Sequence, residues 1–168
     1  MNSANSIACI IPCYNEAPRL RKVFNIASKS QYLDRLICVN DGSTDATGDI
    51  VAHEYPKVNL ITNPKNLGKT RAVIKGLAHV TEEYVLMLDA DLHGLKLSEL
   101  DNALSVAKKG TYDMIVMRRT RHKPYVKLLR GDILISGERI VRTDVFKKRR
   151  CTNRFKAFKL RQRLTSMH

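Results

Sequence analysis

The pair of side chains in this sequence best suited to chemistry is Asp89 and Asp91. They follow a short apolar run at 84–88, so both carboxylates stand just beyond a predicted buried strand. Carboxylate oxygens at this spacing can converge on Mg²⁺ or Mn²⁺, which keep open positions for water and substrate phosphates. The pair predicts a metal site for a phosphate-bearing ligand, and the alternative is a simple turn with a helix cap.

Other polar side chains follow the neighbouring apolar runs. Asp41 comes after the run at 35–39, where a carboxylate can accept hydrogen bonds from a base or a ribose. Lys69 and Arg71 open a predicted helix directly after Gly68. Cations beside a helix N-terminus are mildly unfavourable for that helix, so a diphosphate bound there would explain their placement. The alternative is that these two cations are simply solvated.

These residues need a scaffold that brings separate segments of the chain together. Short continuous apolar runs predict strands buried on both faces, at 7–11, 35–39, 58–62, 84–88 and 113–117. Helical spacing of apolar residues predicts helices between them, at 18–30, 45–54, 70–80 and 98–110. We expect Asp45 to cap the second helix, and Ser98, with Asp101, to cap the fourth. This alternation predicts an α/β fold with a mainly parallel sheet flanked by helices, whose strand ends converge on one edge.

The chain is strongly basic, but only over its last third. Its 168 residues fit one domain, and a hydrophobic content of 43% excludes a wholly disordered chain. Residues 1–113 hold 13 Lys/Arg and 13 Asp/Glu, whereas residues 114–168 hold 17 and 3, which accounts for the net charge of +14. This asymmetry predicts an anionic partner: a phosphate ligand, an acidic membrane surface or nucleic acid. No apolar run approaches the ~18–20 residues that span a bilayer, and we expect a cytoplasmic protein.

The cysteines carry no metal-site or redox motif. They are Cys9, Cys13, Cys38 and Cys151, with no CxxC pair and no histidine at metal-site spacing. Cys9 and Cys38 stand inside apolar runs. We therefore expect reduced, buried, structural thiols in a reducing compartment.

Four segments, in order and in register over about residues 6–117, resemble one known family. They are residues 7–16 (IACIIPCYNE), 37–45 (ICVNDGSTD), 66–69 (NLGK) and 86–91 (LMLDAD). Together they look like the family 2 glycosyltransferases of the GT-A fold. The later segment 136–142 (SGERIVR) is similar to small bacterial members of this family, some of them related to polyprenyl-phosphate sugar transferases.

The resemblance implies a Rossmann-like three-layer sandwich that binds a UDP- or GDP-sugar with Mg²⁺ or Mn²⁺. It implies that Asp91 coordinates the metal on the diphosphate and that Asp89 contacts the ribose or the metal. It also implies that Asp41 contacts the base. The donor-binding residues that we expect are Pro12, Tyr14, Glu16, Asp41, Gly68, Lys69, Arg71, Asp89 and Ala90. The cation would neutralise the leaving diphosphate while the acceptor attacks the opposite face of the sugar, which inverts its configuration.

The chain departs from the family after the SGER-like segment, where members usually continue with further core elements. We place a catalytic domain at 1–146, with an acceptor-side segment at 118–146 and a basic tail at 147–168. Glu138 is the candidate general base, with a structural ion pair as the alternative. A phosphate acceptor would need no base, because it is already ionised at pH 7.

The basic tail and the short end leave three functions open. The first is a metal-dependent, inverting transferase, for which a lipid phosphate is one candidate acceptor and the tail would lie on the inner membrane face. The second is a catalytically incomplete donor-binding domain. The third, which we expect least, is a basic nucleic-acid-binding protein, because the strand-end motifs are not needed to hold a nucleic-acid backbone.

Overall fold

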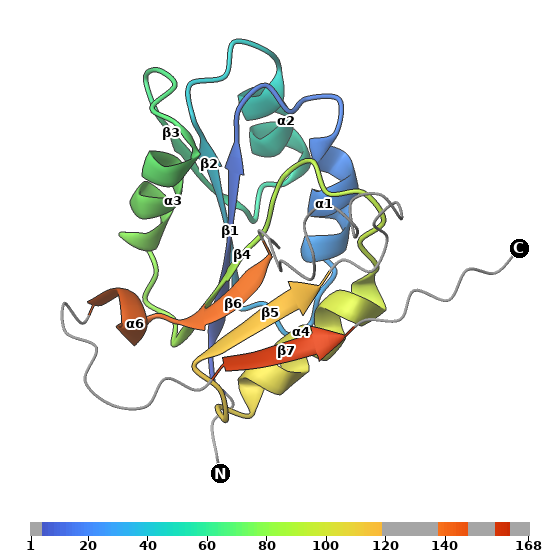
Figure 1. Cartoon of the computed structure of the whole chain (residues 1–168). Helices are drawn as coiled ribbons and strands as arrows, with labels where there is room; N and C mark the ends of the chain where they lie inside the picture. Colours follow the sequence, from blue (N-terminus) through green and yellow to red (C-terminus); the bar gives the residue numbers. More distant parts are fainter. Residues whose placement is uncertain (1–4, 119–137, 148–156, 162–168) are drawn as a thin grey trace, which may run out of the picture.

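The computed structural model describes residues 5–118, 138–147 and 157–161 (Figure 1). Its strands are β1 (Ile7–Cys13), β2 (Arg35–Asn40), β3 (Asn59–Thr62), β4 (Tyr84–Met87), β5 (Met114–Arg118), β6 (Arg139–Arg142) and β7 (Ala157–Arg161). Its helices are α1 (Leu20–Ala27), α2 (Thr47–Glu54), α3 (Lys69–Leu77), α4 (Leu97–Lys108) and α6 (Asp144–Lys147). The five strands and four helices predicted within residues 5–118 are all confirmed, with shifts of a few residues at their ends.

The strands form one mixed sheet in the order β3-β2-β1-β4-β6-β5-β7. β1 pairs in parallel with β2 and β4, and β2 pairs in parallel with β3. β6 runs antiparallel between β4 and β5, so it is the strand that departs from the predicted parallel arrangement. The carboxyl ends of β1, β2 and β4 consequently meet at one edge, as expected for a doubly wound sheet.

The core has two layers because successive strand residues face opposite sides of the sheet. In β1, Ile7, Cys9 and Ile11 pack with residues of α1, α2 and α4, whereas Ala8 and Ile10 pack with residues of α3. All five are completely buried. Strands buried on both faces explain why these segments are continuously apolar rather than alternating. The predicted three-layer sandwich, with a sheet between two layers of helices, is confirmed.

Helix capping differs in detail from the prediction. α4 begins at Leu97 after Lys96, without a side-chain cap, so the predicted cap at Ser98 is wrong. Asp101 instead accepts a hydrogen bond from the hydroxyl of Ser30, which links α4 to the segment that follows α1. Asp45 stands one residue before the N-cap position of α2, yet its Oδ1 still accepts a hydrogen bond from the Thr47 amide at 2.9 Å.

The basic C-terminal part contributes a strand rather than a helix where it is described. We expected a tail or the end of an amphipathic helix at 147–168, but 157–161 form β7, which pairs in parallel with β5. Most of the acceptor-side segment and of the tail lies outside the described residues. Among the helices that are described, none combines the length and the apolar content needed to cross a membrane.

Candidate active site

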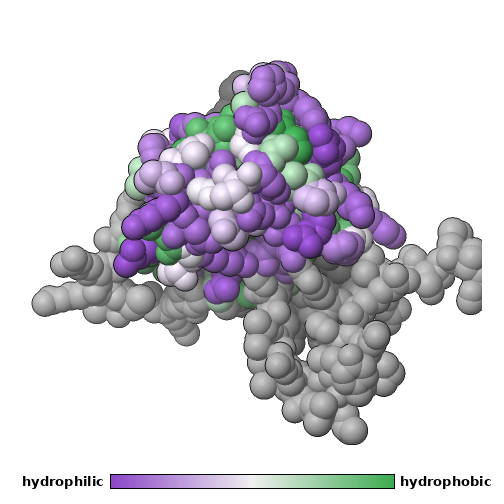
Figure 2. All heavy atoms as spheres, turned by 90° about the horizontal axis from the view of Figure 1, so that it is seen from above, coloured by the Kyte–Doolittle hydropathy of each residue, from purple (hydrophilic) through white to green (hydrophobic). Residues whose placement is uncertain are grey.

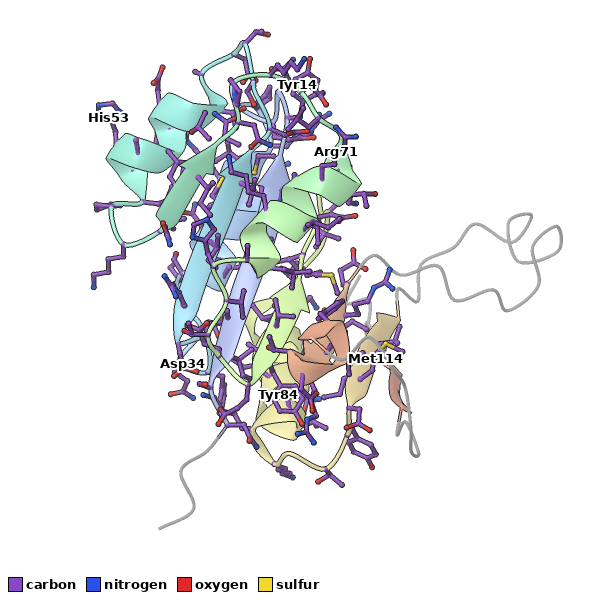
Figure 3. All side chains as sticks on the ribbon, turned by 90° about the vertical axis from the view of Figure 1, so that its left-hand side faces the viewer. Tyr14, Asp34, His53, Arg71, Tyr84 and Met114 are labelled. Atoms are coloured by element: carbon purple, nitrogen blue, oxygen red, sulfur yellow. The ribbon has the colours of Figure 1, made fainter. Side chains whose placement is uncertain are left out.

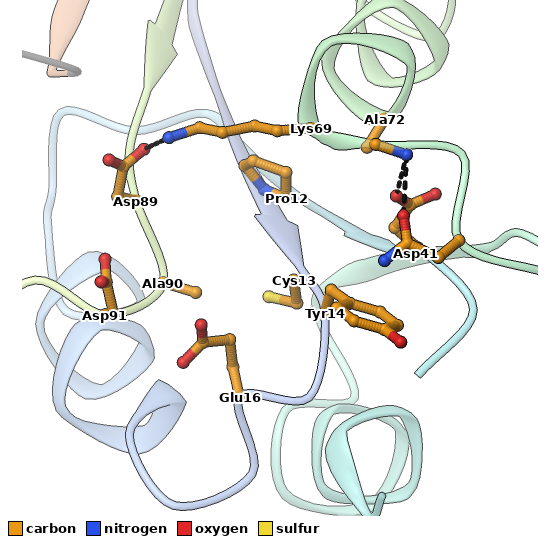
Figure 4. Close-up of a pocket in the computed structure, with 12 residues that line it drawn as sticks. Pro12, Cys13, Tyr14, Glu16, Asp41, Lys69, Ala72, Asp89, Ala90 and Asp91 are labelled. Atoms are coloured by element: carbon orange, nitrogen blue, oxygen red, sulfur yellow. Dashed lines mark hydrogen bonds and ion pairs between the residues drawn. The ribbon is translucent and has the colours of Figure 1, made fainter. Parts of the chain in front are cut away.

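A pocket of about 340 Å³ opens at the carboxyl end of β1 and β4 (Figure 4). Its lining residues come from the end of β1 and the loop after it, from the segments after β2, β3 and β4, and from the start of α3. They are Pro12, Cys13, Tyr14, Glu16, Asp41, Asn66, Gly68, Lys69, Ala72, Asp89, Ala90 and Asp91. Hydrophilic residues cover most of the face seen from this end of the sheet (Figure 2). The convergence of four chain segments predicted from the sequence is therefore present.

Asp89 and Asp91 lie on one side of this pocket. Asp89 Oδ1 accepts a hydrogen bond from Lys69 Nζ at 2.7 Å, across the pocket from the start of α3 (Figure 4). Asp91 is exposed, and its charge helps to raise the pKa of Arg19, whose main partner is Glu16 at 2.8 Å. Ala90, between the two aspartates in the chain, is buried and also lines the pocket.

Two carboxylates fit a cation that also binds a ligand. The described residues contain no group of three or more His, Cys, Asp or Glu arranged to hold a metal ion. Mg²⁺ is usually held in proteins by one or two carboxylates, with waters and substrate phosphates completing its shell. Asp89 and Asp91 therefore suit a metal that arrives with a diphosphate better than a permanently bound structural ion.

Asp41 is buried, with an exposed fraction of 3%, and its carboxylate is heavily engaged. It accepts hydrogen bonds from Asn63 Nδ2 at 2.6 Å and from the amides of Leu67 and Gly68 at 3.1 Å and 2.8 Å. Lys75 Nζ in turn donates to Asn63 Oδ1 at 2.6 Å. The Asp41 carboxylate thus holds the loop that precedes α3, in addition to lining the pocket.

The loop after β1 supplies the opposite wall. Tyr14 is 44% exposed, so its ring presents an open aromatic face at the rim, while Pro12 and Glu16 are partly buried. Cys13 is buried beneath them, and its Sγ lies 3.7 Å from that of Cys38. The contact with Cys38, together with burial, raises the pKa of the Cys13 thiol, so this sulfur stays protonated.

Two predicted site residues do not line the pocket. Arg71 is exposed on α3, at the same end of the molecule as Tyr14 (Figure 3), but it is not among the described residues that line the cavity. Glu138 is only 3% exposed and directly precedes β6, where Arg139 pairs with Met87. Glu138 therefore stands near the pocket end of β4 but is not among the residues that line the cavity, and its assignment as a base stays a prediction.

Sequence reasoning missed three of the lining residues. Cys13, Asn66 and Ala72 lie next to predicted site residues in the chain, but they carry no chemical signal of their own. Ala72 is completely buried one helical turn after Gly68, where its small side chain lets the start of α3 approach the site. Their position in the chain, next to predicted site residues that end or follow strands, is the signal that could have identified them.

The chain is therefore an α/β domain with a polar pocket at the carboxyl ends of parallel strands, the place where open α/β sheets bind their ligands. The family model of glycosyl transferase family 2 matches residues 8–165. The chain belongs to this family, as its motifs predicted.

Individual relatives agree with this assignment. The chain is 34% identical over 173 residues to the uncharacterized glycosyltransferase YaiP of Escherichia coli, covering 84% of this chain and 42% of that protein. It is 39% identical over 97 residues to the dolichyl-phosphate beta-glucosyltransferase ALG5A of Trichomonas vaginalis, covering 51% of this chain and 30% of that protein. The chain thus spans well under half the length of these two relatives.

Solved structures share the fold. The mannosyltransferase PcManGT from Pyrobaculum calidifontis, in complex with GDP-Man and Mn²⁺, superposes with a TM-score of 0.70 at 22% identity, over 87% of this chain and 47% of that one. TarS residues 1–349 from S. aureus superpose with a TM-score of 0.68 at 23% identity, over 84% and 48%. These similarities confirm the GT-A fold predicted from the sequence.

Proposed function

We propose that this chain binds a nucleoside-diphosphate sugar, UDP- or GDP-linked, and transfers the sugar with inversion of configuration. The observation that carries the proposal is the arrangement of Asp89 and Asp91 opposite Lys69 in a pocket at the strand ends. An open aromatic face at Tyr14 suits a flat base, and the carboxylates with Lys69 suit a diphosphate and its cation.

Asp89 and Asp91 are the residues that would hold Mg²⁺ or Mn²⁺. When bound, the cation would neutralise the negative charge that develops on the departing diphosphate. Lys69 would contribute a second positive charge from the other side of the pocket. The structural similarity to PcManGT, which was solved in complex with GDP-Man and Mn²⁺, and the membership of this chain in glycosyl transferase family 2 support this proposal.

A lipid-linked phosphate is the acceptor class that we propose. ALG5A is named as a dolichyl-phosphate glucosyltransferase, and a phosphate acceptor is ionised at pH 7 and needs no general base. This fits a pocket in which Glu138, the candidate base, does not line the cavity. Contact of the basic C-terminal part with an anionic membrane at the cytoplasmic face belongs to the same proposal.

Calorimetry with UDP-glucose, GDP-mannose and the free diphosphates, with and without Mn²⁺, tests donor binding. We expect binding that requires the metal and is lost in Asp91→Ala. Asp49→Ala is the matched control, because Asp49 is an exposed carboxylate in the first turn of α2, outside the pocket lining. Absence of nucleotide binding by the wild type under every condition would refute the proposal.

The second candidate function is donor binding without turnover. It is favoured by the lining of the pocket, which includes Asp89, Asp91 and Lys69 but not the candidate base Glu138. Transfer of a radiolabelled sugar to a lipid extract separates the two candidates, since the second predicts donor binding with no labelled lipid. Steeply salt-dependent RNA binding that is indifferent to Asp91→Ala would instead support a nucleic-acid-binding protein.

A further inference from the structure

The loop after β1 is fastened along its length to the segment after β2. Asn15 N donates to Ser43 Oγ at 3.0 Å, and Glu16 N donates to Thr47 Oγ1 at 2.8 Å. Ala17 N donates to Asp45 Oδ2 at 3.1 Å. Three consecutive backbone amides therefore find side-chain acceptors from one short segment, and such a run of paired donors leaves the loop little freedom.

The side chain of Asn15 also accepts a hydrogen bond from the segment after β2, so each of the two segments donates to the other. Asn15 Oδ1 accepts this hydrogen bond from the Thr44 amide at 2.9 Å. Its backbone is left-handed, with φ of 53°, a conformation that non-glycine residues adopt uncommonly and asparagine tolerates best. The surrounding hydrogen bonds hold this conformation, and it turns the chain so that Tyr14 and Glu16, on either side of Asn15, both line the pocket.

The segment after β2 is itself anchored. Thr47 is completely buried at the start of α2. The Ser43 amide donates to Oδ1 of Asn40, a buried residue at the end of β2, at 3.1 Å. Asp45 Oδ1 accepts from the Thr47 amide, so this carboxylate ties α2 to the loop after β1. A fixed segment of this kind can impose its geometry on the loop that it binds.

We propose that Ser43, Asp45 and Thr47 are positioning residues that hold Tyr14 and Glu16 in the geometry that binds the nucleotide. None of the three is among the described residues that line the pocket, so their effect on a ligand would act through the loop at 14–17. The identity of the ligand rests on the proposed function, but the restraint on the loop does not. The segments at 14–17 and 43–47 therefore act as one unit.

The test compares Thr47→Val with Thr143→Val. Both replace a buried threonine by a side chain of the same shape, but Thr143 Oγ1 has no hydrogen-bond partner among the described residues. Thr143 follows β6, and its amide donates to the carbonyl of Glu83, which directly precedes β4. Asp89, by contrast, follows the other end of β4, so Thr143→Val reports the effect of a buried substitution far from the pocket.

Amide hydrogen exchange in the ligand-free protein is the first measurement. We expect Thr47→Val to speed exchange about tenfold or more at Asn15, Glu16 and Ala17 together, because the three amides share one restraint. Thr143→Val should leave all three unchanged. Faster exchange confined to the Glu16 amide would overturn the proposal, because it would show independent hydrogen bonds rather than a common restraint.

Nucleotide affinity is the second measurement, made by calorimetry at a temperature where every variant is fully folded. We expect Thr47→Val to weaken binding of the UDP- or GDP-linked donor about fivefold to tenfold. Unchanged affinity in Thr47→Val would overturn the positioning role, even if its stability fell. If the wild type binds no nucleotide, the proposed function fails, while the exchange experiment still decides whether these residues restrain the loop.

Discussion

Lys69 Nζ lies 2.7 Å from Asp89 Oδ1, so the pocket holds an ion pair at the position where we propose that a cation binds. Lys69 is the first residue of α3, and Asp89 follows β4, so the pair joins two segments across the pocket. Without a ligand, the lysine neutralises a carboxylate that would otherwise face its neighbour Asp91. Lysine and a divalent cation must then compete for Asp89, unless a diphosphate draws the ammonium group away.

This competition predicts opposite effects of Lys69→Met on metal and nucleotide. Mn²⁺ alone should bind about twofold to fivefold more tightly, because a modest exposed ion pair no longer opposes it. The donor with Mn²⁺ should bind more weakly, because the diphosphate loses a positive charge. Titrations followed by the Mn²⁺ electron-spin resonance signal and by calorimetry measure the two affinities.

Lys57→Met is the control for this charge change, since Lys57 is exposed and lies outside the pocket lining. It should alter neither affinity. A parallel decrease of both affinities in Lys69→Met would contradict competition at Asp89 and would indicate that Lys69 simply supports the pocket.

Two glycines with left-handed backbones should respond very differently to alanine. A Cβ at Gly42, with φ of 69°, would lie 2.3 Å from the backbone carbon of Lys65, whereas a Cβ at Gly68, with φ of 90°, would meet nothing within 4 Å. Gly68→Ala should therefore lower the free energy of unfolding by about 1–3 kcal/mol, from backbone strain alone. Gly42→Ala should cost more than about 3 kcal/mol, because the loop at 65–66 must also move. Chemical denaturation measures the free energy of unfolding of both variants. Equal losses would contradict the prediction, because they would show that the loop at 65–66 moves at little energetic cost.

Removing Asn63 should weaken donor binding although its side chain does not line the pocket. Asn63 links Asp41 to Lys75, and Asp41 holds the amides of Leu67 and Gly68. We expect Asn63→Ala to lower the free energy of unfolding by about 1–3 kcal/mol, because a buried carboxylate loses a donor. The affinity for the donor should also fall, and calorimetry on the folded variant measures this affinity. An unchanged affinity would show that the loop before α3 keeps its place without this link.

The order of the elements could be predicted from the sequence because each buried strand is a continuous apolar run between polar turns. The runs at 7–11 and 35–39 correspond to β1 and β2, whose residues are buried except for the partly exposed Pro12 and Arg35. The predictions were weaker where tertiary contacts outweigh local preference. Ser98 has a good capping side chain, but α4 begins one residue earlier, and its expected partner Asp101 binds Ser30 instead.

Most of the predicted site residues line one pocket, but Arg71 and Glu138 do not, and the hydrogen bonds that connect the site were not predicted. Strand-end position brings Asp41, Asp89 and Asp91 to one pocket, as expected from a parallel sheet. The hydrogen bonds from Asn15 to Ser43 and from Glu16 to Thr47 join residues about 30 positions apart, and no local sequence pattern predicts such pairs. The insertion of β6 between β4 and β5 also depends on long-range pairing that the sequence pattern does not encode.

Stability should fall in acid partly through Asp45. Its desolvation raises the pKa, but hydrogen bonds from Thr47 and Ala17 outweigh this and hold the pKa below the ordinary value. A carboxyl group whose pKa is lowered by folding stabilises the protein above its unfolded pKa, and this contribution disappears as the pH falls through the folded pKa. We expect the wild type to lose less than about 1 kcal/mol through this group, because it is exposed and screened by solvent.

Denaturation of Asp45→Asn between pH 6 and pH 3 checks this expectation, and the variant should show a shallower decline than the wild type. Asp34→Asn is the comparison variant. Despite desolvation, Lys108 and the Ile7 amide lower the pKa of Asp34, which lies at the opposite end of the molecule from Tyr14 (Figure 3). Both variants should flatten the pH dependence of stability, but only Asp45→Asn should also speed exchange of the Ala17 amide. Equal exchange in the two variants would show that Asp45 stabilises the fold without restraining the loop.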